Sequence, residues 1–235
     1  MSTRTSATFS NRILARLAPM DLAILLPHLT AVDLPLRRPL EIRNKPIEYV
    51  YFPESGFASV VADGSSARSI EVGLIGREGM TGLAIVMGTD RTPHQTFMQH
   101  AGAGHRITVG RLRAAMEERE AIRTCFLLYG HAFVIQTTYT AMANGRSKIE
   151  ERLARWLLMA RDRLDDDEIN LTHEFLSQML GVRRAGVTLA LNLLERAGLI
   201  RTARGNIHIV DREGLEELSN GAYGKPEAEF NRLLG

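Results

Sequence analysis

The chain has 235 residues, of which 45% are hydrophobic and 24% are charged, and its formal net charge is +2. This composition is typical of a globular protein with a buried core, and the length accommodates two modest domains. The small net charge excludes a uniformly basic chain, so a nucleic-acid-binding surface would have to be local. The single cysteine, Cys125, excludes an intrachain disulfide and cannot supply the several thiolates of an iron–sulfur cluster.

The sequence predicts no membrane segment and no secretion signal. No stretch approaches 18 uninterrupted apolar residues, and the first residues, MSTRTSATFSNR, lack the apolar core of a signal peptide. We therefore expect a cytoplasmic protein that does not contact a membrane.

The first half of the chain predicts a small helical cap followed by a β-domain. Residues 10–29 carry leucine and isoleucine at helical spacing, broken by Pro19 and closed by Pro27, which predicts two short helices. Residues 31–107 contain short apolar runs such as EYVYF, FASVV and SIEVGLI, separated by proline and glycine. Many short strands with frequent turns indicate a β-barrel or a double-sheet jelly roll.

Long helices are predicted between residues 109 and 164, where proline is absent. The segment 121–143 has a wide apolar face, which includes Tyr129 and Tyr139, and a second helix is expected at about 147–164. A helix with so wide a face has to be covered on two sides, and we expect the barrel on one side and a partner chain on the other.

An acidic run, residues 165–168, follows these helices. Carboxylates are suitable ligands for a divalent cation, but no glycine-bearing calcium-loop spacing follows the run. We interpret it as a solvated turn and expect no metal site.

Residues 171–210 carry the pattern of a helix-turn-helix. Thr172 is a good N-cap for a short helix that ends near Leu180, and Gly181 breaks that helix. A second helix is expected from about Arg183 to Ala197, where apolar residues recur at a spacing of 3.6. Two short helices joined through a glycine turn make a helix-turn-helix.

A β-hairpin wing is predicted directly after the second helix, because the turn-prone Arg204, Gly205 and Asn206 precede the alternating IHIV. The segment 172–212 has six arginines and three acidic residues, a local net charge of +3. Arg183 and Arg184 open the second helix, whose N-terminal residues reach base edges when such a helix enters the major groove. Double-stranded DNA is the expected partner.

The chain resembles the cyclic-AMP receptor and fumarate–nitrate regulator (Crp/Fnr) family over nearly its whole length. The strongest match is LTHEFLSQMLGVRRAGVTLALNLLERAGLI, and weaker matches are EYVYFPESGFASVV and GLIGREGMTG. The resemblance implies an α+β chain with an N-terminal cyclic-nucleotide-binding-type β-barrel (jelly roll) at 1–120, a dimerisation helix at 121–145 and a winged helix-turn-helix at 146–235. It also implies a transcription regulator that acts as a homodimer on a palindromic operator and contacts RNA polymerase.

The resemblance carries over to the DNA-binding residues only in part. Arg184 takes the place of the family's first base-reading arginine, whereas Ala185 replaces the common glutamate and Leu189 the common second arginine. The operator sequence is therefore not inherited. The expected DNA-binding residues are Thr172, His173, Arg183, Arg184, Thr188, Leu189, Asn192, Arg201 and Arg204.

An effector site in the barrel is implied by the family's phosphate-binding cassette, which pairs Gly-Glu with a later Arg-Ser. Glu78, Arg91 and Thr92 offer similar residue types at a longer separation, and Thr137 and Thr138 take the place of a hydroxyl pair near the adenine. An unidentified effector is expected at these residues, and the altered spacing argues against a cyclic nucleotide as cofactor.

Two alternatives to an effector-controlled regulator are considered. A haem- or metal-sensing regulator would use His94, His100 or His105, since histidine is a common ligand. A small-molecule-binding protein with catalytic activity is the other, but Gly102-Ala103-Gly104 lacks a third glycine, and no nucleophile elbow or zinc-protease motif occurs. We expect no enzyme.

Overall fold

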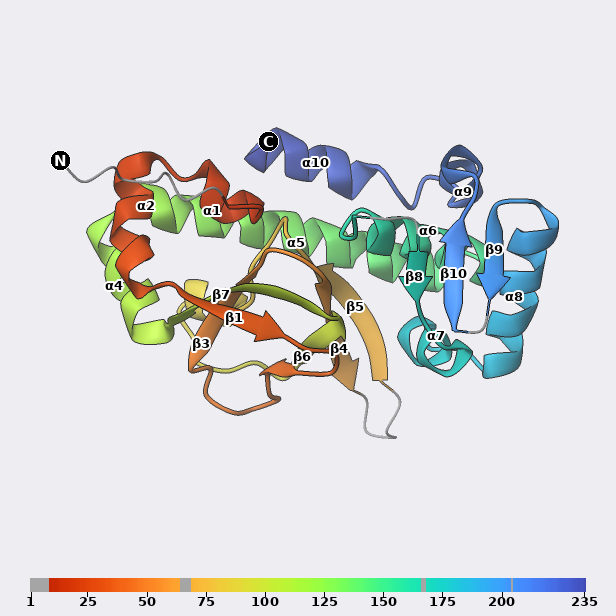
Figure 1. Cartoon of the computed structure of the whole chain (residues 1–235), viewed down its shortest axis with the longest axis horizontal. Coiled ribbons are helices and arrows are strands. Elements are labelled where there is room, and N and C mark those ends of the chain that lie inside the picture. The colour runs from red at the N-terminus through yellow and green to blue at the C-terminus, as the bar shows by residue number, and fades with distance from the viewer. Residues whose placement is uncertain (1–8, 64–68, 166–167, 204) are drawn as a thin grey trace.

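A computed structural model of the chain describes residues 9–63, 69–165, 168–203 and 205–235. Figure 1 shows two lobes joined by the long helix α5, with a β-domain on one side and the helix-turn-helix lobe on the other. None of the helices in these ranges combines the length and the apolar character needed to cross a bilayer.

The N-terminal cap consists of α1 (Arg12–Arg16), α2 (Pro19–Leu25) and the 3-10 turn η1 (Leu26–His28), as the two prolines predict. The buried Asn11 caps α1 by accepting the backbone N–H of Leu14, and its amide donates to the carbonyls of Pro53 and Gly79. This side chain therefore fixes the cap on the β-domain.

The β-domain is built from two antiparallel sheets, which confirms the predicted jelly roll. One sheet has the order β1–β7–β3 and the other the order β2–β6–β4–β5. The strands are β1 (Thr30–Leu34), β2 (Pro39–Glu41), β3 (Tyr49–Pro53), β4 (Phe57–Asp63), β5 (Ser69–Ile75), β6 (Gln95–His100) and β7 (Gly102–Thr108). The short helix α3 (Leu83–Val86) lies between β5 and β6, and α4 (Val109–Glu118) follows β7.

The long helix α5 (Glu120–Arg146) packs one face against the β-domain. The side-chain amide of Gln136 accepts the N–H of Leu74 at 2.7 Å and donates to the carbonyl of the same residue at 3.2 Å. Gln136 thus occupies backbone groups of the edge strand β5 that a neighbouring strand would otherwise pair with, and these two hydrogen bonds hold α5 on the sheet.

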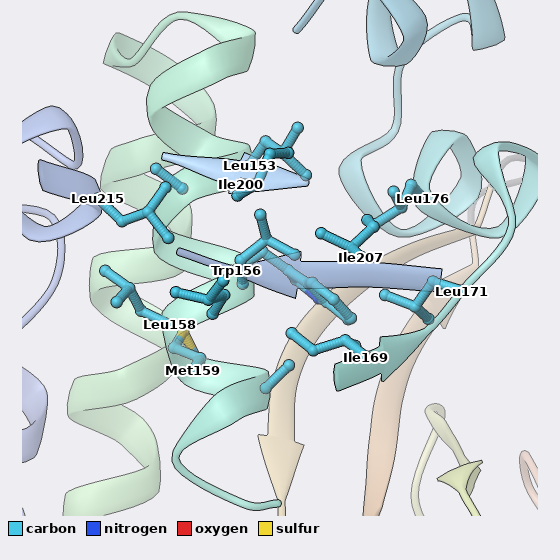
Figure 2. Close-up of a cluster of buried hydrophobic side chains, with 14 of the residues drawn as sticks. Leu153, Trp156, Leu158, Met159, Ile169, Leu171, Leu176, Ile200, Ile207 and Leu215 are labelled. Carbon is cyan, nitrogen blue, oxygen red and sulfur yellow. The ribbon is translucent and has the colours of Figure 1, made fainter. Parts of the chain in front are cut away.

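The C-terminal lobe is a winged helix-turn-helix. Its elements are α6 (Ile149–Arg161), β8 (Glu168–Asn170), α7 (His173–Leu180), α8 (Arg184–Arg196), β9 (Ile200–Ala203), β10 (Asn206–Ile209) and α9 (Arg212–Leu218), and α10 (Lys225–Leu234) follows them in the chain. Figure 2 shows its core, in which Leu153 and Trp156 of α6 meet Ile200 and Ile207 of the wing. The strand β8 adds a third member to the wing sheet, which has the order β8–β10–β9.

The last helix, α10, does not stay with the winged helix-turn-helix. It returns to pack along α5, as Figure 1 shows, and it also contacts α1. Arg12 donates to the Asn231 side chain and lies 4.6 Å from the centre of the Phe230 ring. The predicted C-terminal unit, residues 146–235, includes α10, but α10 packs on the N-terminal half of the chain.

The two lobes share a hydrophobic core, because Phe57 of β4 and Leu74 of β5 belong to the cluster that fills the C-terminal lobe. At this junction the indole of Trp156 donates to the carboxyl group of Glu71 at 2.6 Å, and the Ser59 hydroxyl donates to its other oxygen at 2.5 Å. Burial raises the pKa of Glu71 to about 7.

Because the pKa of Glu71 is raised, the stability of the folded protein should fall as the pH rises. The folded chain holds a proton on Glu71 between about pH 4.5 and about 7, whereas the unfolded chain has released it. The contribution of the protonated Glu71 carboxyl to the free energy of unfolding is complete below about pH 4.5. It is lost as the pH rises to about 7, by about 1.4 kcal/mol for each pH unit. We expect Glu71→Gln to flatten the decline, measured by denaturant unfolding between these pH values.

The matched control is Glu213→Gln, which removes an exposed carboxylate on α9 and should keep the wild-type dependence. Equal slopes for Glu71→Gln and the wild type would show that the Glu71 carboxyl does not titrate in this window.

Candidate nucleic-acid interface

The first helix of the helix-turn-helix begins and ends as the sequence predicts. Thr172 is the N-cap of α7, and its hydroxyl accepts the backbone N–H of Phe175 at 3.2 Å. Gly181 adopts φ +63°, a left-handed conformation that favours glycine, and it ends the helix. Arg152 of α6 donates to the carbonyl of Leu180, which fixes the end of α7 on the helix behind it.

The second helix, α8, presents a polar face that the lobe leaves uncovered. Arg183 is its N-cap and Arg184 its first residue, and both side chains are exposed, as is Asn192 two turns further on. Leu189 is 65% exposed, which is unusual for leucine. The opposite face, with Val187, Ala190, Leu191 and Leu194, is buried in the lobe.

Two of the expected DNA-binding residues contact each other across the turn. The Nδ1 atom of His173, at the start of α7, lies 3.1 Å from the hydroxyl of Thr188 on α8. The same hydroxyl donates to the carbonyl of Arg184 at 3.2 Å. The contact ties the start of the first helix to the exposed face of the second.

The wing is held beside α8 by one carboxylate. Glu195 accepts the backbone N–H of Thr202 at 2.7 Å and the hydroxyl of the same residue at 3.0 Å. Arg201 on β9 is exposed, and Arg204 lies outside the described residues. The structure therefore brings seven expected residues onto α7 and α8 and one onto the adjacent wing strand.

One of the six arginines counted between residues 172 and 212 does not lie on the helix-turn-helix or the wing. Arg212 starts α9 and pairs with Asp162 at 2.9 Å, and it also contacts Glu216 and the hydroxyl of Tyr223. Asp162 and Glu216 compensate the charge of Arg212, so the count of six arginines overstates the positive charge available to DNA.

The expected effector residues are not assembled into one site. Glu78 pairs with the buried Arg163 at 2.7 Å, whereas Arg91 is exposed and pairs with its neighbour Asp90. The hydroxyls of Thr137 and Thr138 both donate to the carbonyl of Val134 within α5. A cradle in which Glu78 and Arg91 act together is therefore not formed.

The start of α3, near Thr92, is occupied by a side chain of the protein itself. The buried carboxylate of Glu41 accepts the N–H of Gly82 at 2.7 Å and the hydroxyl of Thr96 at 2.5 Å. Thr92 and His94 line a small cavity of about 70 Å³ beside this group. Sequence reasoning missed Glu41, because its partners lie 41 and 55 residues away.

The histidines proposed as haem or metal ligands lie in different settings. His100 stacks on Phe57, and His105 lies 3.3 Å from Glu54. Among the described residues, no three His, Cys, Asp or Glu side chains are grouped as a metal ion would require.

Comparison with known proteins agrees with this geometry. Residues 151–218 match the Crp-like helix-turn-helix domain. No curated protein matches the chain.

Three solved structures share the fold over most of the chain. A putative transcriptional regulator of the Crp/Fnr family from Eubacterium rectale is 17% identical, with a TM-score of 0.70 over 87% of this chain and 96% of that chain. FixK2 from Bradyrhizobium japonicum is 18% identical, with a TM-score of 0.70 over 81% and 96%. TTHB099, a CRP-family transcriptional regulator from Thermus thermophilus, is 19% identical, with a TM-score of 0.68 over 82% and 98%.

The fold and the domain match together define a transcription-regulator architecture with a DNA-binding helix-turn-helix. More particularly, the chain has the Crp/Fnr fold, with a cyclic-nucleotide-binding-like sheet domain, a long helix and a Crp-like helix-turn-helix. The resemblance inferred from the sequence is confirmed.

The N-cap of α7 provides a test of how this interface is held. Thr172→Ala removes the side-chain acceptor for the N–H of Phe175 and should lower the free energy of unfolding by about 1 kcal/mol. Thr172→Ser keeps the hydroxyl and should remain near the wild type. Chemical denaturation of the three proteins measures the difference, and equal losses in both variants would contradict the capping role.

Proposed function

We propose that the protein is a transcription regulator that binds a palindromic operator as a homodimer, under the control of an effector bound by the N-terminal half. The observation that carries the proposal is the exposed pair Arg183 and Arg184 at the start of α8, within a Crp-like helix-turn-helix. We also propose a cytoplasmic location and contact with RNA polymerase, and we assign no catalytic activity.

The roles of the side chains follow from their positions. Arg184 stands where the N-terminal end of a recognition helix reaches base edges, and its fork suits a bidentate contact with guanine. Asn192 shares the exposed face of α8, and Leu189 is suited to contact a thymine methyl group. Thr172 and Arg201 flank the helix and are assigned to the phosphate backbone.

A homodimer is supported by an exposed stripe along α5. Leu127 is 45% exposed and Val134 is 49% exposed. Exposed residues recur at alternating spacings of three and four, which is the spacing of the contact positions in a coiled coil, and one of the two positions is apolar, with Leu127, Val134 and Ala141. We call this set the α5 stripe: Thr124, Leu127, His131, Val134, Thr138, Ala141 and Gly145.

The α5 stripe replaces Tyr129 as a proposed contact between protomers. Tyr129, on the face first expected to meet a partner chain, is 2% exposed and packs against Gly79 of its own chain. We propose the division 1–120, 121–145 and 146–235 as functional units, although α10 packs on α5.

Operator recognition is tested by selecting genomic fragments and titrating the recovered motif. The two α8 helices of a dimer should read half-sites about 34–36 Å apart. Arg184→Ala should cost about 1–3 kcal/mol of discrimination at one base pair in each half-site. Arg201→Ala should weaken binding to all sequences alike and make the salt dependence shallower by about one unit for each phosphate that the variant no longer neutralises.

The control is Arg196→Ala, which removes an exposed arginine at the far end of the same helix and should leave the base preference unchanged. Recovery of no palindromic motif, or equal affinity for selected and random DNA, would overturn the proposal.

Dimerisation is tested by placing a charge on the α5 stripe. Val134→Asp should produce monomers in sedimentation experiments, because an unpaired carboxylate would be buried between the protomers. The matched control is Leu36→Asp, which changes a leucine that is 57% exposed outside the stripe and should leave a dimer. A wild-type monomer at micromolar concentration would exclude the homodimer.

A further inference from the structure

The exposed face of α8 has an apolar centre between two polar ends. Arg184 stands at the N-terminal end of this face and Asn192 lies two turns further on, and both are exposed. Between them lie the exposed side chains of Ala185 and Leu189, which are one turn apart on the same side of the helix. Among the described residues, no large hydrophobic side chain is more exposed than Leu189, at 65%. An apolar surface therefore occupies the middle of the face that is free to meet a partner.

The one polar side chain of this turn is already engaged. The hydroxyl of Thr188 donates to the carbonyl of Arg184 at 3.2 Å and lies 3.1 Å from Nδ1 of His173. The other side chains of residues 185–189 are those of alanine, glycine, valine and leucine, and none of these forms hydrogen bonds. Apart from the engaged hydroxyl, this turn thus has no side chain that can read a base by hydrogen bonding.

An apolar surface can still discriminate between bases, because the major groove displays one apolar group. Thymine presents a methyl group on carbon 5 beside its O4 acceptor, and apolar side chains recognise thymine by contact with this methyl group. Unmodified cytosine presents its N4 donor and has no methyl group. Cytosine that is methylated on carbon 5 carries the same methyl group at the same place in the groove. The chemical group that suits Ala185 and Leu189 is therefore the 5-methyl group of a pyrimidine.

The surroundings of the apolar centre favour DNA, and not a second protein, as the partner that covers it. Arg183 and Arg184 lie at one end of the exposed face, Arg196 lies at the other, and Arg201 lies on the adjacent wing strand. All four side chains are exposed. In a DNA duplex, phosphate groups on both edges of the major groove neutralise such charges while the bases between them meet the centre of the helix face.

We propose that α8 recognises the 5-methyl group of pyrimidines through Leu189 and Ala185, and that it accepts 5-methylcytosine in place of thymine. Operator affinity then responds to a chemical modification of DNA, because methylation of a cytosine that faces Leu189 strengthens binding. The inference rests on the proposed function, since it requires α8 to lie in the major groove, and it adds the modification to which this site responds. Burial of one methyl group against an apolar surface changes the affinity by about fourfold.

Titration of the full-length protein with synthetic operator duplexes tests the inference. At each pyrimidine of the selected half-site, thymine is compared with uracil, both opposite adenine, and 5-methylcytosine is compared with cytosine, both opposite guanine. Each comparison changes one methyl group and leaves the hydrogen-bonding groups of the base pair unchanged. We expect one position at which the methyl group strengthens binding by about fourfold per half-site in both comparisons.

Variants of α8 assign this methyl effect to one side chain. Leu189→Ala should reduce both ratios to below about twofold, whereas Leu189→Met keeps an apolar side chain of similar size and should retain them. The matched control is Leu193→Ala, which shortens a leucine that is 52% exposed, one turn further from the start of the helix, and should retain both ratios. Because Leu189 is exposed, its replacement should leave the fold intact.

The outcomes separate this inference from the proposed function. Recovery of a palindromic operator at which neither methyl group changes the affinity, or equal methyl effects in the wild type and in Leu189→Ala, overturns the inference and leaves the proposed function standing. Weaker binding of 5-methylcytosine than of cytosine at the position where thymine is preferred to uracil also overturns it. Equal affinity for selected and random DNA overturns both.

Discussion

The hydrogen bond between Trp156 and Glu71 fixes the DNA-binding lobe on the β-domain. The Trp156 ring also contacts Phe57 of the sheet and Phe175 of α7 edge-on, at centroid distances of 6.3 and 6.4 Å. One side chain of α6 therefore touches both lobes, and the position of α7 relative to β5 depends on it. A fully buried carboxyl is costly, and here a hydroxyl and an indole N–H satisfy its oxygens.

The close approach of α5 to the loop after β5 requires that Gly79 has no side chain. A Cβ atom at Gly79 would lie 2.1 Å from the hydroxyl oxygen of Tyr129, a distance that real Cβ contacts do not show. Gly79 thus allows α5 to approach the loop after β5, where Glu78 meets Arg163.

The parts of the fold that depend on local sequence could be predicted. The cap at Thr172, the left-handed turn at Gly181 and the apolar spacing of α8 are properties of neighbouring residues, and all three are confirmed. Partners distant in the chain could not be predicted. Glu78 was matched to Arg91 by the residue types of the family's cassette, whereas its partner Arg163 is 85 residues away, and no periodicity in the sequence links them.

The wide apolar face of α5 is a second case in which local sequence cannot identify the partners of a residue. Amphipathic spacing predicts that the face is covered but not what covers it. The β-domain covers one side, α10 covers a second, and the α5 stripe stays exposed. Because α10 arrives from the far end of the chain, only the folded structure separates the residues that pack within the protomer from those left for a partner. Tyr129 therefore belongs to the core of the protomer, whereas Leu127 and Val134 belong to the outer surface of the same helix.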